Sequence, residues 1–209
     1  MNKLNKKTIC IFGNQRGGKT TFMDKILNDQ FEENYFSTIG FDLRRLSITI
    51  ENKEYKISLV ENPGQEKYRL KLNSVTNYLA ECDAIIYMYD ITDKESFNSF
   101  DKLIEEVEKN AKNNCPRIIV GNKIDLEEKR QIKEEEGKNF AENKGMVFFE
   151  ISVKTGENLD NLTLFIIKKI FNLEDDFAGE IIVGKKNINE KKKDEEICVE
   201  KFCCFYSGL

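Results

Sequence analysis

A glycine-rich loop near the N-terminus constrains this chain most: residues 13–20 have the pattern G-x-x-x-x-G-K-[ST]. The apolar run over residues 8–12 predicts a buried strand before the loop. After it, apolar side chains at positions 22, 23, 26 and 27 have the spacing of one helix face. A glycine loop between a strand and a helix offers backbone N–H groups and a helix N-terminus to an anion. The pattern predicts a phosphate-binding loop, with an ordinary glycine-rich turn as the alternative.

The residues of such a loop have distinct tasks. Its lysine reaches the β- and γ-phosphates of a nucleotide, and its Ser or Thr hydroxyl binds Mg²⁺. In this chain these residues are Lys19 and Thr20. We expect a nucleotide to contact the loop and the start of the helix, which comprise Asn14, Gln15, Arg16, Gly17, Gly18, Lys19, Thr20 and Thr21.

The composition excludes several kinds of chemistry. The chain of 209 residues has no histidine, which rules out Ser–His and Cys–His nucleophile pairs and histidine-containing zinc sites. A formal net charge of −4 argues against nucleic acid as a partner. Cys10 and Cys115 lie in or beside apolar runs, where reduced thiols are expected. Since no signal peptide or membrane-spanning run is visible, we expect a cytoplasmic protein.

Strand-like and helix-like segments alternate along the chain. We predict strands over residues 8–12, 41–51, 54–60, 84–90, 117–121 and 146–151, and helices over residues 21–27, 67–81, 95–112, 131–144 and 159–173. The second and third strands form a hairpin that turns at Asn52-Lys53. This order predicts an α/β domain with a mostly parallel sheet and helices on both faces. The domain should cover residues 1–174, and the charge-rich residues 175–209 should form a flexible tail.

A second motif follows the predicted strand over residues 117–121. Asn122, Lys123 and Asp125 form the pattern N-K-x-D. A carboxylate at Asp125 can accept two hydrogen bonds from the ring N–H and amino group of guanine, which adenine does not offer in that arrangement. A site built on such bonds rejects the wrong base strongly, because its polar groups would lose their partners. Lys123 can lie along the base, and Asn122 can contact the ring or connect loops.

Together these motifs resemble the Ras superfamily of small GTPases, most closely its Rab branch, over about residues 6–171. Further segments carry the likeness. Ser152-Val153-Lys154 is similar to the last guanine-binding motif, with a backbone N–H near Val153 facing the base. Phe31 matches the aromatic residue that packs on the guanine edge. Tyr35 and Thr38 resemble the first switch, and Gly64-Gln65 resembles the second.

The resemblance implies a P-loop small G domain with a mostly parallel six-stranded sheet and one antiparallel edge strand. It implies GTP and GDP as ligands together with Mg²⁺, which Thr20 and Thr38 would bind directly and Glu61 through a water. GTP hydrolysis would depend on Lys19 and on Gln65, which aligns the attacking water. The γ-phosphate would order both switches. Effectors, exchange factors and GTPase-activating proteins would bind through the switches, in vesicle trafficking.

The chain departs from the family pattern at several positions. The second switch usually reads D-T-A-G, and here it is Glu61-Asn62-Pro63-Gly64. Pro63 fixes its φ angle and restricts Asn62, so we expect a stiffer hinge. Val60 replaces a tryptophan typical of Rab effector surfaces, which predicts unusual partner recognition.

Gln15 and Arg16 stand where the family has small residues. Bulk at Gln15 would obstruct the arginine finger of an activating protein and make hydrolysis slow. Arg16 is either an exposed charge or a built-in cation near the phosphates. Two alternatives to a hydrolysing switch stay open. One is a GTP-binding scaffold with negligible hydrolysis, and the other is a P-loop ATPase or kinase, which the N-K-x-D motif disfavours.

A cysteine pair, Cys203-Cys204, lies near the C-terminus, and five residues follow it. The pair resembles the double-prenylation site of Rab proteins, which would carry the protein to the cytoplasmic face of an internal membrane. Five following residues are more than such tails usually have. Unmodified thiols and palmitoylation are therefore alternatives to prenylation.

Overall fold

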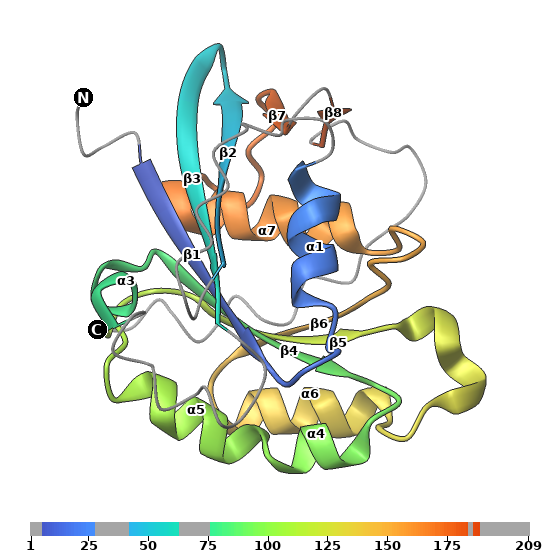
Figure 1. Cartoon of the computed structure of the whole chain (residues 1–209). Coiled ribbons are helices and arrows are strands. Elements are labelled where there is room, and N and C mark those ends of the chain that lie inside the picture. Colours follow the sequence, from blue (N-terminus) through green and yellow to red (C-terminus); the bar gives the residue numbers. More distant parts are fainter. Residues whose placement is uncertain (1–5, 28–41, 63–75, 184–185, 189–209) are drawn as a thin grey trace.

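A computed structural model of the chain describes residues 6–27, 42–62, 76–183 and 186–188. They form one eight-stranded sheet in the order β6-β5-β4-β1-β3-β2-β7-β8 (Figure 1). The strands are β1 Lys6–Gly13, β2 Asp42–Ile50, β3 Lys53–Glu61, β4 Ala84–Asp90, β5 Arg117–Asn122, β6 Val147–Ile151, β7 Ile181–Val183 and β8 Lys186–Asn187. The helices are α1 Lys19–Leu27, α3 Thr76–Glu81, α4 Lys94–Asn98, α5 Phe100–Glu108, the 3₁₀ helix η3 Ile124–Lys129, α6 Glu134–Asn143 and α7 Leu159–Phe171.

The centre of the sheet is parallel and covered on both faces, as the sequence predicts. Strands β3, β1, β4, β5 and β6 run parallel to one another, and all seven residues of β4 are buried. Helices α1 and α7 cover one face, while α3, α4, α5 and α6 cover the other (Figure 1). Strands buried on both sides need apolar side chains in both directions, which is why β4 is a continuous apolar run.

The β2–β3 hairpin turns one residue earlier than predicted. Glu51 and Asn52 occupy the turn, with φ angles of 46° and 63°. Two consecutive positive φ angles are the geometry of a type I′ turn, which matches the twist of the flanking strands and favours asparagine. The prediction of a hairpin is thus correct, but its position at Asn52-Lys53 is not.

The helix predicted over residues 95–112 is two helices, α4 and α5, which meet at Ser99, and α5 ends at Glu108. The Ser99 hydroxyl donates to the Ser96 carbonyl at 2.9 Å, a local bond that competes with regular helix. It also accepts a hydrogen bond from Asn14 Nδ2 at 2.7 Å. This junction therefore contacts the glycine-rich loop. Asp93 caps α4, because its side chain accepts a hydrogen bond from the Ser96 N–H at 3.0 Å.

The sheet is two strands wider than the six predicted, because β7 and β8 extend it beyond β2. Strand β7 pairs antiparallel with Ile48–Ile50 of β2, and the Glu51 N–H donates to the Glu180 carbonyl at 3.1 Å. Ile181 and Val183 are buried in the core that α1 and α7 cover. The antiparallel strand β2 is therefore not the edge. The folded domain therefore continues past residue 174, the C-terminal boundary predicted from the sequence.

This packing predicts that Ile181→Ala destabilises the domain by about 2–4 kcal/mol, because the Ile181 side chain is fully buried. The neighbouring residue Ile182 points the other way and is half-buried, so Ile182→Ala should cost about 1 kcal/mol or less. Urea unfolding of both variants measures the difference. Equal effects of the two substitutions would contradict the placement of β7.

Three cysteines meet in the core on the α5 side of the sheet. Cys10, Cys82 and Cys115 are free and buried, in agreement with the reduced thiols expected for Cys10 and Cys115. The sulfur atoms of Cys82 and Cys115 lie 3.5 Å apart. Hydrogen bonding with Cys10 raises the pKa of the Cys82 thiol to about 11, which disfavours its reactive thiolate.

Candidate functional site

The predicted site segments that the structure describes meet at the carboxyl ends of the parallel strands. The glycine-rich loop leaves β1, Glu61 ends β3, Asn122 ends β5, and Ser152 follows β6. In Figure 1 these ends lie along one side of the sheet, where the loop turns into α1. Ligands of open α/β sheets bind at this location.

The loop has a backbone that only glycine allows at two positions. Gly13 and Gly18 have φ angles of 152° and 93°. A Cβ atom at Gly13 would lie 2.1 Å from the Met88 carbonyl oxygen, and one at Gly18 would lie 2.2 Å from Asn122 Nδ2. The loop therefore packs directly against β4 and the N-K-x-D segment.

Lys19 lies inside this loop. Its side chain is 4% exposed, and its ammonium group donates to the Asn14 carbonyl at 2.9 Å. The same group lies 3.8 Å from Glu61 Oε1. The ammonium group is therefore buried and held at the loop, a position where an anionic ligand could interact with it.

Thr20 and Glu61 face each other across the end of β3. The Thr20 hydroxyl lies 2.8 Å from Glu61 Oε2 and 3.0 Å from Oε1. Burial raises the pKa of the Glu61 carboxyl, and the charge of Lys19 and the Thr20 hydrogen bond partly offset this. A desolvated carboxylate beside a hydroxyl is a set of hard oxygen donors, the kind that Mg²⁺ prefers.

Within the ranges that the structure describes, no three Cys, Asp or Glu side chains form a metal-binding group. Mg²⁺ in nucleotide sites is usually bound by one or two carboxylates together with substrate phosphates and waters. Glu61 and Thr20 supply a carboxylate and a hydroxyl side by side, and these donors fit such a site.

Asn122 connects the two halves of the site. Its side chain is buried, donates to the Gly17 carbonyl at 2.9 Å and accepts from the Val153 N–H at 3.1 Å. Asn122 thus takes the loop-connecting role, one of the two proposed from the sequence. The resemblance implies that a backbone N–H near Val153 faces the base, and the N–H of Val153 itself donates to Asn122.

Asn122→Ala should lower the free energy of unfolding by about 2–4 kcal/mol, because the Gly17 carbonyl and the Val153 N–H would both be left buried without this partner. Asn139→Ala, on the exposed side of α6, is the matched control and should change stability by less than about 0.5 kcal/mol. Urea unfolding without nucleotide measures both. A loss below about 1 kcal/mol for Asn122→Ala would show that the connection is not structural.

The carboxylate of Asp125 contacts side chains of the Ser152-Val153-Lys154 segment. The Ser152 hydroxyl donates to Asp125 Oδ1 at 2.6 Å, and the Lys154 ammonium lies 3.8 Å from Oδ2. The Asp125 side chain is 12% exposed, whereas that of Lys154 is 80% exposed. The carboxylate is therefore oriented and mostly desolvated, as a base-reading group must be.

Lys123 adopts a left-handed backbone conformation with φ of 74°, and its ammonium forms an ion pair with Asp90. Asp90 Oδ1 also accepts from the Thr92 N–H and hydroxyl, at 2.9 and 2.7 Å. The sequence assigned no role to Asp90. Its position at the end of a buried strand, before Thr92, is the signal that could have indicated one.

The remaining predicted residues fall into two groups. In the described part, Gln15, Arg16, Thr20 and Thr21 are exposed, and Arg16 has a positive φ of 66°. A non-glycine residue in this conformation is strained by about 1–2 kcal/mol. The others lie outside the described residues: Phe31, Tyr35, Thr38, Gly64, Gln65, Cys203 and Cys204.

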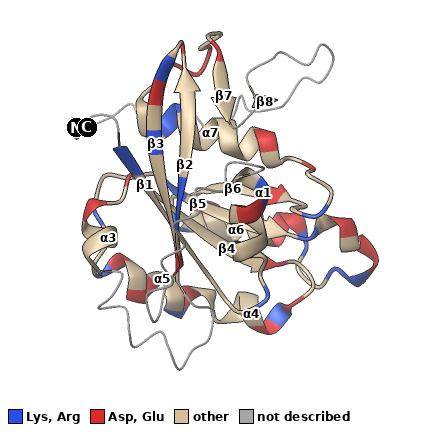
Figure 2. Cartoon of the chain, turned by 45° about the horizontal axis from the view of Figure 1, so that its top comes forward, with Lys and Arg blue, Asp and Glu red and all other residues tan. Residues whose placement is uncertain are grey.

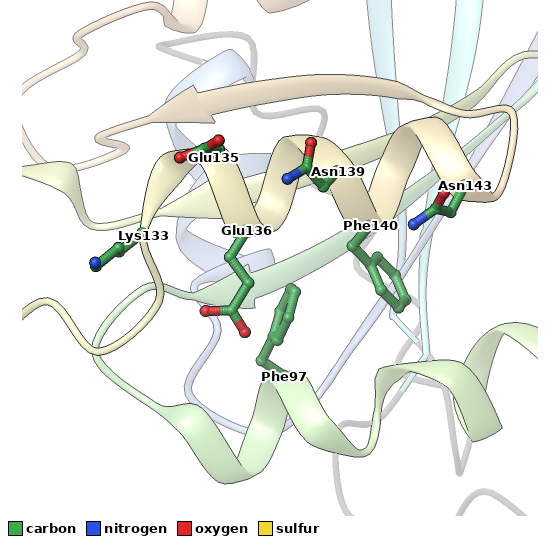
Figure 3. Close-up of a pocket in the computed structure, with 7 residues that line it drawn as sticks. All are labelled: Phe97, Lys133, Glu135, Glu136, Asn139, Phe140 and Asn143. Carbon is green, nitrogen blue, oxygen red and sulfur yellow. The ribbon is translucent and has the colours of Figure 1, made fainter.

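A pocket of about 440 Å³ lies away from this site, between α4 and α6. Figure 3 shows Glu136 and Phe140 of α6 directed toward Phe97 of α4. Lys133, Glu135, Asn139 and Asn143 complete its lining. None of the predicted site residues lines it. Acidic and basic residues are mixed on the surrounding helices, as α5 shows in Figure 2.

Comparison with known proteins decides the family. The model of the Ras family matches residues 7–172, which is most of the chain. The chain belongs to the Ras family. It is 34% identical to the Ras-related protein Rab-13 of Bos taurus over 152 residues, 73% of each chain. It is 30% identical to the Ras-related protein Rab-33 of Caenorhabditis elegans, over 94% of this chain and 67% of the relative.

A third relative is the GTP-binding protein ypt2 of Schizosaccharomyces pombe, 29% identical over 87% of this chain and 89% of the relative. The chain is therefore a Rab-like small GTPase of the Ras superfamily, and its α/β small G domain is the fold predicted from the sequence. Among the helices that the structure describes, none has the length and apolar character to cross a membrane.

Proposed function

We propose that this Rab-like protein binds GTP and GDP with Mg²⁺ and hydrolyses GTP as a molecular switch in vesicle trafficking. One observation carries the proposal: Asn122 bonds to both the phosphate loop and the segment that orients Asp125. This connection joins the glycine-rich loop to the segment that orients Asp125, which supports a phosphate site and a guanine-reading carboxylate in one unit. Membership of the Ras family and the Rab-named relatives support the same function.

Lys19 and the N–H groups of the loop would hold the β- and γ-phosphates. The ammonium group and the helix N-terminus lower the cost of the negative charge that accumulates on phosphoryl oxygens during hydrolysis. Because Lys19 is already buried and held by the Asn14 carbonyl, little reorganisation is needed when the nucleotide binds.

Mg²⁺ would neutralise phosphate charge when bound. Thr20, Glu61 and Thr38 are the residues proposed to hold it, of which Thr20 and Glu61 lie in contact. Asp125 would read the guanine ring N–H and amino group, while Phe31, Lys123 and the Ser152–Lys154 segment surround the base. Tyr35 would cover the phosphates.

Gln65 would orient the attacking water, and Thr38 with the Gly64 N–H would sense the γ-phosphate, so that hydrolysis releases both switches. The side chain of Gln15 is exposed on the loop, where it would obstruct an arginine finger. We therefore propose slow hydrolysis and regulators adapted to this loop. Effectors and exchange factors would bind through the switch regions.

The C-terminal tail would bring the protein to a membrane through lipid groups on Cys203 and Cys204. The body would then cycle between the cytoplasm and the cytoplasmic face of an internal membrane. Mass spectrometry of the native protein tests this step, and unmodified cysteines would contradict it.

Single-turnover hydrolysis of GTP separates a hydrolysing switch from a GTP-binding scaffold. The wild type should convert bound GTP to GDP, and Gln65→Leu should slow this by at least about 10-fold, because the attacking water loses its orienting group. GDP affinity is the control and should stay unchanged. If wild type and variant both leave GTP intact over hours, the scaffold is the better description.

A further inference from the structure

The side chain of Asn14 connects the glycine-rich loop to the junction of α4 and α5. Asn14 Nδ2 donates one hydrogen bond to the Ser99 hydroxyl at 2.7 Å and one to the Ser96 carbonyl at 2.9 Å. An asparagine amide has two N–H donors, so both are used at this junction. Helices α4 and α5 cover the face of the sheet opposite α1 (Figure 1). The loop that leads into α1 is therefore anchored to helices on the other face.

The backbone of the same residue holds the lysine of the loop. The Asn14 carbonyl oxygen accepts a hydrogen bond from Lys19 Nζ at 2.9 Å. The side chain and the carbonyl of Asn14 share one Cα atom, so an amide group fixed at Ser96 and Ser99 limits how far the carbonyl can move. The position of the ammonium group that would meet the β- and γ-phosphates thus depends on a contact with α4 and α5.

The strained backbone of Arg16 indicates that this part of the loop needs such support. Its φ angle is 66°, in the left-handed region that favours glycine. Strain of this kind persists only where the surrounding structure holds it. Arg16 lies between two anchors: Asn14 is bonded to the α4–α5 junction, and the Gly17 carbonyl accepts from Asn122 Nδ2 at 2.9 Å. The loop is therefore held on both sides of its strained residue.

We propose that Ser99 is a positioning residue of the nucleotide site, which keeps the phosphate loop in its binding conformation through Asn14. The inference rests on the proposed function, because it requires that Lys19 meets the β-phosphate of a nucleotide. Ser99 acts on phosphate binding and not on base recognition, since a separate hydrogen bond, from Ser152 to Asp125, orients the guanine-reading carboxylate.

The affinities of the full-length protein for GDP and GMP, measured with Mg²⁺, test the proposal. Ser99→Ala removes the hydroxyl that Asn14 contacts and leaves the Ser96 carbonyl in place. It should weaken GDP binding by about 3–10-fold, the loss expected for one hydrogen bond. GMP has no β-phosphate for Lys19, so its affinity should change by less than about twofold. Equal losses for both nucleotides, or an unchanged GDP affinity, would overturn the proposal.

Two further variants identify the group that acts. Ser99→Thr keeps the hydroxyl and should bind GDP as the wild type does, whereas a loss equal to that of Ser99→Ala would contradict the role of the hydroxyl. Asn98→Ala is the matched control, because Asn98 is the neighbouring residue at the end of α4 and its side chain is exposed. This control should leave both affinities unchanged.

A double-mutant cycle remains informative if Ser99→Ala lowers the stability of the protein. Asn14→Ala keeps the carbonyl that holds Lys19 and removes both bonds to the junction, so it should weaken GDP binding by about 10-fold or more. Adding Ser99→Ala to Asn14→Ala should cost no further affinity, because both substitutions remove the same contact. Additive losses, or an unchanged GDP affinity of Asn14→Ala, would overturn the proposal.

A failure of the proposed function would give a different result. If the wild type does not bind GDP in the presence of Mg²⁺, the proposed function is wrong and the role of Ser99 falls with it. If the wild type binds GDP tightly and Ser99→Ala binds it equally well, the function stands and only the role of Ser99 is wrong.

Discussion

Asp125→Ala is expected to weaken GDP binding by about 10²–10⁴-fold. A carboxylate that accepts two hydrogen bonds from guanine contributes about 1.5–3 kcal/mol for each bond, and about 1.4 kcal/mol corresponds to a factor of ten. The Asp125 side chain is mostly desolvated and already oriented by Ser152. We therefore expect a loss of affinity in the upper part of this range. Titration calorimetry with GDP and Mg²⁺ measures the loss.

The matched control is Glu128→Ala. Glu128 lies in the same 3₁₀ helix as Asp125, and the substitution removes an acidic side chain that is exposed. This variant should bind GDP as the wild type does. Competition with ATP gives a second check: ATP should not displace GDP from the wild type at equal concentrations. If Asp125→Ala binds GDP within about threefold of the wild type, the guanine assignment of the N-K-x-D motif is wrong.

The central strands were predictable because their burial is determined by their own residues. A run such as Ala84–Asp90 is apolar throughout, and only a strand covered on both faces needs that pattern. The hairpin was predictable for a similar reason, since its turn depends on two adjacent residues. Its position was missed by one residue because Glu51 adopts a positive φ, which sequence preferences do not favour for glutamate.

The missed features depend on contacts between distant segments. The break at Ser99 involves Asn14, which lies 85 residues earlier. Strand β7 has only three residues, and its place is determined by the open edge of β2 and the core below it. No periodicity in residues 175–188 indicates this pairing, so these residues were predicted to belong to the flexible tail.

The candidate site was predictable to the level of motifs. The glycine-rich loop and the N-K-x-D pattern can each be recognised from a few adjacent residues. The described parts of both motifs do meet at one end of the sheet. The distances that give these residues their chemistry were not predictable. The contact of Glu61 with Thr20 depends on the register between β1 and β3, and no single segment contains that information.

Gly13→Ala should have the largest effect on the fold, a loss of more than about 4 kcal/mol that leaves little folded protein. The added Cβ would meet the Met88 carbonyl oxygen at 2.1 Å, and this atom belongs to the backbone of a buried strand. Neither β1 nor β4 can move away without disrupting the pairing of Gly13 with Met88. Circular dichroism and thermal unfolding of the purified protein measure the loss.

The control variant Gly145→Ala separates the steric overlap of an added Cβ atom from the strain of a positive φ angle. Gly145 also has a positive φ, 65°, but a Cβ atom there would have nothing within 4 Å. Only the cost of the left-handed conformation remains, about 1–2 kcal/mol, so this variant should fold. Should Gly13→Ala unfold no more easily than Gly145→Ala, the tight contact between the phosphate loop and β4 would be refuted. The rigid base that this contact gives to Lys19 and Thr20 would be refuted with it.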